Sequence, residues 1–110
     1  MIIEMPLRTY SAANLREHWA VRARRVRAER RSTFWALKGA SFVPHLPARI
    51  TLCRISSAAL DDDNLRSAFK GIRDEIAAAY EVPDNDPRLS WEYTQESCKR
   101  GTYSVRITLE

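Results

Sequence analysis

The segment from Leu65 to Tyr80 constrains the fold more than any other part of the sequence. Its large apolar residues step by four, three, four and four positions: Leu65, Phe69, Ile72, Ile76 and Tyr80. This spacing places them along one stripe of an α-helix, and Pro83 lies just beyond its end. The pattern therefore predicts one amphipathic helix. A chain of 110 residues is the size of one small domain, so we expect a single domain over residues 1–110.

The strand pattern is confined to four other segments. We expect a short first strand within residues 2–7 and a β-branched strand over Ala48–Ser56. Two closing strands are expected over residues 89–95 and 102–109, joined as a hairpin through Lys99-Arg100-Gly101. With a helix before the second strand, the order is β-α-β-α-β-β. This order predicts an α+β fold, a small mixed sheet packed by two helices.

The helix expected before the second strand is strongly basic. Asn14 and Glu17 have the spacing of a capping box at its start. An apolar stripe follows, which forms either part of the core or the interface of a homodimer. Because Arg30 interrupts this stripe, we expect the helix to bend or break at residues 30–32. The members of the stripe are Leu15, Trp19, Ala23, Val26 and Leu37.

Positive charge is concentrated on this helix. From Arg16 to Lys38 the sequence has seven Arg and one Lys against two Glu, a local net charge of +6 in a chain of net charge +4. An Arg-dominated run suits phosphate geometry, which indicates a nucleic-acid partner; the alternative is a solvated face that keeps the protein soluble. The candidate DNA-binding residues are Arg22, Arg24, Arg25, Arg27, Arg30 and Arg31, with Arg66 on the later helix.

Other classes of protein are not indicated. No apolar run approaches the roughly 20 residues of a membrane span, and the N-terminus lacks the basic and apolar regions of a secretory signal. Cys53 and Cys98 have no partner at disulfide or zinc-ligand spacing. We therefore expect a cytoplasmic protein that does not associate with a membrane.

Three consecutive aspartates, Asp61 to Asp63, stand where the second strand gives way to the second helix. One Asp caps a helix without further function, but three adjacent carboxylates repel one another unless a cation neutralises them. If the approach to the helix is extended, Asp61 and Asp63 point the same way and share a Mg²⁺ ion. Asp84 and Asp86 are candidates for a third ligand. The alternative is a capped helix start and an acidic turn that never meet.

Two motifs carry a family resemblance. Asp61-x-Asp63-Asn64-Leu65 opens the amphipathic helix, and Asn85-Asp86-Pro87-Arg88-Leu89 follows about twenty residues later. This combination resembles the RusA family of Holliday-junction resolvases, small bacterial and prophage endonucleases. The resemblance covers residues 50–109 well and is weaker over the first forty-five.

The resemblance implies a RusA-like endodeoxyribonuclease domain. Family members are Mg²⁺-dependent homodimers that resolve four-way junctions by paired symmetric nicks in DNA recombination and repair. For this chain we expect Mg²⁺, with Mn²⁺ as the alternative metal. The family's catalytic and metal-binding carboxylates correspond to Asp61, Asp63 and Asp86, with Asp84 as the rival of Asp86.

One position departs from the family pattern, which often has a lysine four residues after the second Asp. Here that residue is Ser67. Lys70 lies on the same helix face as Asp63 and leans back toward it, so Lys70 is the candidate catalytic lysine, with Arg66 as the second candidate. The alternative for Lys70 is an ion pair with Asp74. The alternative for the whole chain is a catalytically weakened DNA-binding relative of the resolvases.

Overall fold

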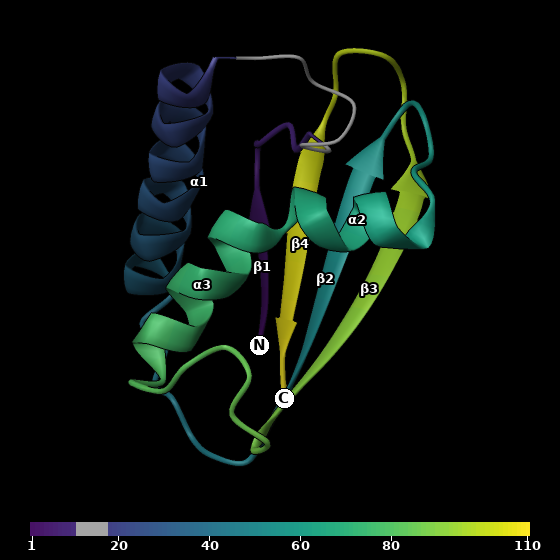
Figure 1. Ribbon diagram of the computed structural model, residues 1–110. Coiled ribbons are helices and arrows are strands. Elements are labelled where there is room, and N and C mark those ends of the chain that lie inside the picture. The colour runs from purple at the N-terminus through teal and green to yellow at the C-terminus, as the bar shows by residue number, and fades with distance from the viewer. Residues whose placement is uncertain (11–17) are drawn as a thin grey trace.

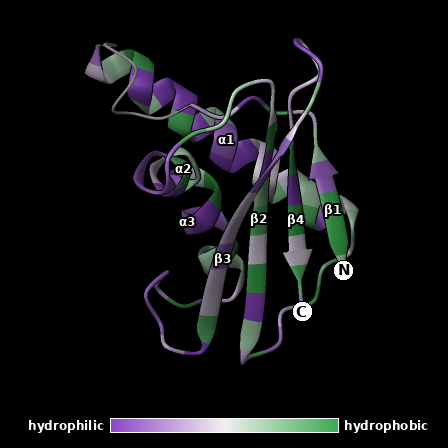
Figure 2. Cartoon of the chain, turned by 90° about the vertical axis from the view of Figure 1, so that its right-hand side faces the viewer, coloured by the Kyte–Doolittle hydropathy of each residue, from purple (hydrophilic) through white to green (hydrophobic). Residues whose placement is uncertain are grey.

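A computed structural model describes residues 1–10 and 18–110. Within them, four strands form one mixed sheet in the order β1-β4-β2-β3, in which β2 and β3 are parallel and the other two pairs antiparallel. Helices α2 and α3 cover one face of the sheet, and α1 packs along α3 and beside β1 (Figures 1 and 2). The elements are β1 (Ile2–Met5), α1 (Trp19–Gly39), β2 (Ala48–Ser56), α2 (Asp62–Ala68), α3 (Lys70–Ala79), β3 (Leu89–Ser97) and β4 (Ser104–Leu109).

The core forms between this sheet face and the predicted helical stripe. Ile50, Leu52 and Ile107 from the two central strands are fully buried. The whole predicted stripe is buried against the sheet: Leu65, Phe69, Ile72, Ile76 and Tyr80. The expected α+β class and mixed sheet are therefore confirmed, and β2 has the expected bounds.

The predicted second helix is divided into two, which gives three helices instead of two. At Phe69, between α2 and α3, φ is −99° and ψ is 6°. The Phe69 amide donates to the Arg66 carbonyl, and the Ser67 hydroxyl donates to the Asn64 carbonyl at 3.0 Å. A hydroxyl that bonds the backbone of the preceding turn competes with the helical ladder and bends it. The apolar period continues across this bend, so the sequence pattern alone does not reveal it.

Helix α1 runs continuously from Trp19 to Gly39, so the break expected at residues 30–32 is absent. Its buried face continues through two polar residues, Glu29 and Thr33, to Leu37. The Thr33 hydroxyl donates to the Glu29 carbonyl at 2.8 Å, and Arg25 lies 3.7 Å from the Glu29 carboxylate. The hydrogen bond satisfies the buried Thr33 hydroxyl, and the charge of Arg25 lowers the cost of burying the Glu29 carboxylate.

The start of α1 differs from the expected stripe. The Trp19 side chain is 76% exposed and does not join the core, whereas Leu37 is buried. The His18 side chain caps the helix by accepting a hydrogen bond from the Ala20 amide. The predicted capping box and Leu15 lie outside the described residues.

The expected hairpin between the last two strands is wrong. β4 pairs with β1 and β2, whereas β3 pairs with the other edge of β2 and lies parallel to it. The segment that contains Gly101 therefore passes over the end of β2. One face of β4 is buried along its whole length, at Val105, Ile107 and Leu109. This burial favours a central position for β4, between two partner strands, over the edge position that a hairpin with β3 would give it.

Helices α1 and α3 meet at Gly71, where a Cβ atom would lie 3.3 Å from side-chain atoms of Glu29 and Val26. We expect Gly71→Leu to force the helices apart and lower the free energy of unfolding by about 1–3 kcal/mol. Chemical denaturation measures this loss. Gly39→Ala is the matched control, because a Cβ at Gly39 meets nothing within 4 Å. An equal loss in both variants would contradict the proposed close contact.

Candidate functional site

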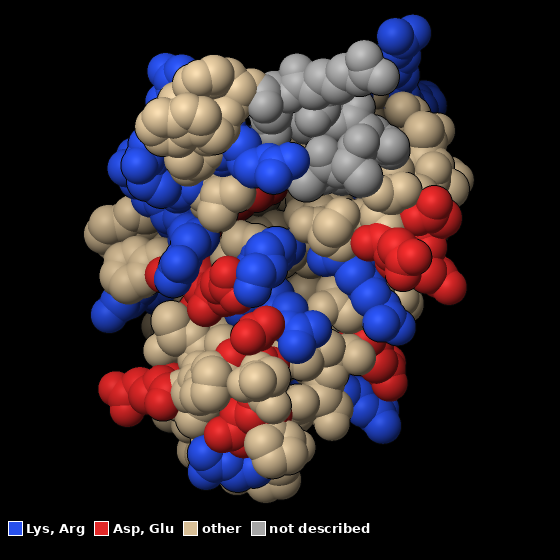
Figure 3. All heavy atoms as spheres, in the orientation of Figure 1, with Lys and Arg blue, Asp and Glu red and all other residues tan. Residues whose placement is uncertain are grey.

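The acidic triplet, Asp61, Asp62 and Asp63, lies in the loop and first helical turn after β2. Asp61 is the N-cap of α2, and its Oδ1 accepts a hydrogen bond from the Asn64 amide at 2.9 Å. The helix already begins at Asp62, so Asp61 and Asp63 are not alternate residues of one extended segment as expected. All three are exposed, and acidic atoms gather at the edge of the molecule over the start of α2 (Figure 3).

The triplet has no basic partner within residues 1–10 and 18–110. Most other carboxylates of that part of the chain pair with arginine or lysine: Glu4, Glu29, Asp74, Glu75, Asp84, Asp86, Glu92 and Glu96. Adjacent carboxylates without a counter-charge repel one another, and a bound cation relieves that repulsion. Among the described acids, the triplet is therefore the adjacent group that lacks a paired base.

Asp84 and Asp86 are engaged elsewhere. The Arg88 guanidinium donates to both carboxylate oxygens of Asp86 at 3.0 and 2.9 Å and holds the pKa of Asp86 at about 2. The Asp84 carboxylate accepts from Arg73 Nε at 2.8 Å. Across the described part of the chain, no three Asp, Glu, His or Cys side chains gather closely enough to hold a metal. Both aspartates therefore face arginines and do not gather with the triplet.

The triplet still fits the donor set of Mg²⁺. This ion is usually bound by one or two protein carboxylates, with water and substrate phosphates as its other ligands. Asp61 keeps one carboxylate oxygen outside its capping bond, and Asp63 forms no ion pair within residues 1–10 and 18–110. Two carboxylates are within the number that Mg²⁺ usually takes from a protein, so Asp61 and Asp63 stay the candidate ligands.

The two candidates for the missing lysine point to different neighbours. Lys70 Nζ lies 3.0 Å from Asp74 Oδ1 and 3.9 Å from Asp84 Oδ2, so the ion pair considered as its alternative role is present. The Arg66 guanidinium lies 5.8 Å from the centre of the Tyr93 ring. In this arrangement the charge of Lys70 is directed to carboxylates of α3 and the loop after it.

Sequence reasoning missed a cluster of aromatic and basic side chains between α3 and β3. The Arg73 guanidinium lies 4.7 Å from the centre of the Trp91 ring and also donates to the Tyr93 hydroxyl. Trp91 Nε1 donates to the Asp84 carbonyl at 2.9 Å. Next to it, a hollow of about 340 Å³ is lined by Asp62 and Arg66 among others. The alternation of Trp91 and Tyr93 along the strand was the available signal.

The arginines of α1 divide into two groups. Arg25 and Arg30 pair with Glu29 and Glu75, the second at 2.9 Å. Arg24, Arg27 and Arg31 are exposed and succeed one another by three and four positions, which places them on one face of the helix. We call these three the basic stripe; basic atoms gather over α1 in Figure 3. Arg22 is also exposed, but it lies about half a turn around the helix axis from the basic stripe.

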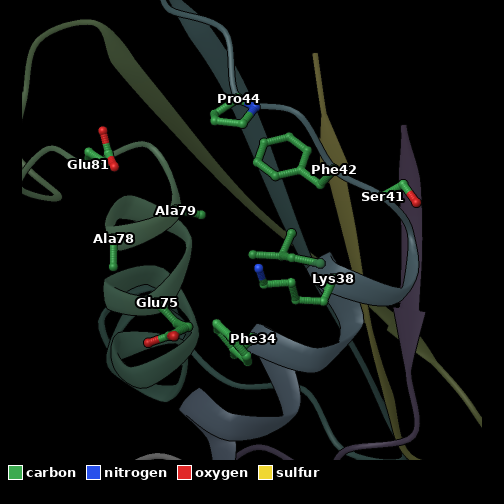
Figure 4. A pocket seen from close by; sticks show the side chains of 10 residues that line it. Phe34, Lys38, Ser41, Phe42, Pro44, Glu75, Ala78, Ala79 and Glu81 are labelled. Carbon is green, nitrogen blue, oxygen red and sulfur yellow. The ribbon is translucent and has the colours of Figure 1, made fainter.

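A second hollow, of about 500 Å³, lies between the C-terminal halves of α1 and α3 (Figure 4). Phe34 and the segment after α1 line one wall, and Ala78 and Ala79 of α3 line the other. It lies away from the start of α2, where the triplet is placed. Because Leu37 is buried in the core, the stripe proposed as a dimer interface is not available as a whole for that role.

No model of a known protein family matches this chain, and no curated protein matches it. None of the helices in residues 1–10 and 18–110 is long and apolar enough to cross a membrane.

Proposed function

We propose that this protein is a Mg²⁺-dependent endodeoxyribonuclease that cuts four-way or other branched DNA. The observation that carries the proposal is the acidic triplet: three exposed carboxylates at a helix start, without a basic partner among the described residues. The basic stripe on α1 supports the same function, because exposed arginines on one helix face suit a phosphate backbone. A cation site and a polyanion surface are the two requirements of a metal-dependent nuclease.

The chemistry requires an activated water and stabilisation of the charge that develops on the phosphate. Mg²⁺ bound at the triplet supplies Lewis acidity for both. Asp61 and Asp63 would hold the ion, and the capping bond from the Asn64 amide fixes the Asp61 side chain. The resemblance assigns Asp86 as a third ligand, but Asp86 precedes β3 whereas the triplet follows β2, so the parallel pairing sets them at opposite ends of these strands, and Asp86 pairs with Arg88.

We further propose that the active form is a homodimer. A four-way junction is two-fold symmetric, and two identical sites related by that symmetry make paired nicks most simply. The two tryptophans of α1, Trp19 and Trp35, are 76% and 62% exposed and are candidates for contact with a second copy or with DNA.

Cleavage of a synthetic four-way junction tests the function. The protein is incubated with the junction and with a linear duplex of the same arm sequence, in Mg²⁺, in Mn²⁺ and in chelator. We expect metal-dependent, symmetric nicks in the junction and none in the duplex. Binding without cleavage in either metal would contradict the nuclease and support the second candidate.

The second candidate is a DNA-binding relative that no longer cuts. Three contacts favour it: Ser67 bonds the backbone of its own helix, Lys70 pairs with Asp74, and Asp86 pairs with Arg88. Residues that the resemblance assigns to catalysis are thereby held by other protein groups.

Lys70→Met tests the proposed catalytic lysine. We expect single-turnover cleavage to fall about tenfold or more with junction binding intact, because an ammonium that stabilises transition-state charge is lost. Asp74→Asn is the matched variant: it removes the partner that holds Lys70 Nζ at 3.0 Å and should leave cleavage intact or raise it. Unchanged cleavage in Lys70→Met would assign Lys70 to the ion pair alone.

A further inference from the structure

Arg54 is a buried arginine that faces the helices from β2. Its side chain is 7% exposed, and its strand neighbours are Val105 and Gln95. Nε donates to the Thr9 hydroxyl at 3.1 Å, and Nη1 donates to the Ala58 carbonyl at 2.6 Å. Both acceptors are neutral. In the part of the chain that the structure describes, no carboxylate pairs with Arg54, and its Nη2 makes no hydrogen bond.

A second arginine, Arg8, directly precedes Thr9, the residue that accepts from Arg54 Nε. The Arg8 guanidinium is 4.3 Å from the centre of the Tyr103 ring and 4.9 Å from that of Tyr10, and Arg8 forms no ion pair within the described ranges. Burial, and then the charge of Arg8, lower the pKa of Arg54. The Ser57 and Tyr103 hydroxyls lie 3.3 Å apart at the same end of the sheet.

Among the described residues, this arrangement leaves the charge of Arg54 without a compensating anion. A buried guanidinium normally needs a counter-charge, and a neighbouring like charge adds to the cost of keeping it ionised. An anion between the two arginines would relieve both effects. The planar guanidinium donates two parallel hydrogen bonds to a phosphate or carboxylate, and phosphate also accepts from hydroxyl groups.

We propose that Arg8 and Arg54, with the hydroxyls of Ser57 and Tyr103, form a binding site for a phosphate group at the end of the sheet. Ala58, which accepts from Arg54, is three residues before Asp61, so the loop from β2 to α2 connects this site to the acidic triplet. A backbone phosphate of nucleic acid is the ligand that fits that position. Only this choice of nucleic acid rests on the proposed function; the phosphate site itself does not.

Phosphate and junction binding are measured in the presence of a chelator. The result is therefore independent of whether the protein cleaves DNA with a metal ion. One arm titrates inorganic phosphate by calorimetry, and the other titrates a four-way junction over a range of salt concentrations. We expect Arg8→Gln to weaken phosphate binding about tenfold, as the loss of one charge-assisted hydrogen bond does. It should also lower the slope of log affinity against log salt by about one unit if the ligand is a DNA phosphate.

The control is Arg49→Gln, which removes an exposed arginine of the same strand that pairs with Glu92 at 3.8 Å. It should leave phosphate binding unchanged. Arg54→Lys is the second variant, because it keeps the positive charge but loses the two parallel hydrogen bonds of the guanidinium. Thermal unfolding of each variant checks that it is folded. Loss of phosphate binding with unchanged junction binding supports the site and identifies free phosphate as its ligand. Phosphate binding that is equal in wild type, Arg8→Gln and folded Arg54→Lys would overturn the proposal.

Discussion

Asp63→Asn removes Mg²⁺-dependent cleavage of a four-way junction and leaves binding of the junction intact. The substitution keeps the shape of the side chain but loses the charge that holds the ion. We expect the single-turnover rate to fall by about two orders of magnitude or more, as is typical when a group that supports transition-state charge is lost. Binding in chelator should be unchanged or tighter at low salt, because one carboxylate no longer repels the phosphates.

Asp61→Asn should behave in the same way without unfolding the protein, because Asn caps a helix about as well as Asp. The capping bond from the Asn64 amide to the side chain can therefore persist. Asp62→Asn is the matched control: Asp62 is equally exposed and adjacent but has no assigned role as a ligand. Full activity in Asp63→Asn would exclude Asp63 as a ligand, and an equal loss in Asp62→Asn would indicate an effect of total charge.

The local elements were largely predictable from sequence because their signals are local. The stripe from Leu65 to Tyr80 is buried as its period required, and the β-branched run Ala48–Ser56 is a strand with the expected bounds. Burial of apolar residues sets both patterns, and each depends on a short window of sequence.

The arrangement of the strands was not predictable in the same way. A turn-forming Gly101 indicates a reversal but does not specify which strand the chain meets afterwards, and β4 pairs with β1 and β2 instead of β3. On α1, Glu29 and Thr33 occupy buried positions, where Arg25 lies 3.7 Å from the Glu29 carboxylate and the Thr33 hydroxyl donates to a backbone carbonyl. The strand order depends on pairing between residues distant in sequence. The burial of polar residues on α1 depends on their polar partners, and the spacing of apolar residues carries no information about either.

In the candidate site, too, local features were visible in the sequence and contacts between distant residues were not. Three adjacent aspartates are visible in the sequence, and the structure leaves them exposed. The engagement of Asp86 by Arg88 is local but competes with the metal role that the resemblance assigns to it. The pairing of buried Arg54 with Thr9 joins residues 45 positions apart and has no sequence signal.

Replacing Arg24, Arg27 and Arg31 together by Glu should weaken junction binding by about two orders of magnitude near 0.1 M salt. Each phosphate contact contributes about 0.9 units to the slope of log affinity against log salt, so the slope should fall by nearly three units. These arginines lie on one exposed face of α1 and are free of ion pairs to carboxylates in the described residues. The loss should be alike for junctions of different sequence, because contacts to the phosphate backbone carry no sequence information.

Arg30→Gln is the control from the same helix. Arg30 pairs with Glu75 at 2.9 Å, so its loss should affect stability, by about 1 kcal/mol or less for a partly exposed pair, and leave the salt slope unchanged. A triple variant with the wild-type slope would show that the basic stripe is only a solvated face. If the salt slope fell in Arg30→Gln as much as in the triple variant, the DNA would contact the side of α1 that faces α3. On that side Arg30 and the residues around Glu75 would be the groups in contact with it.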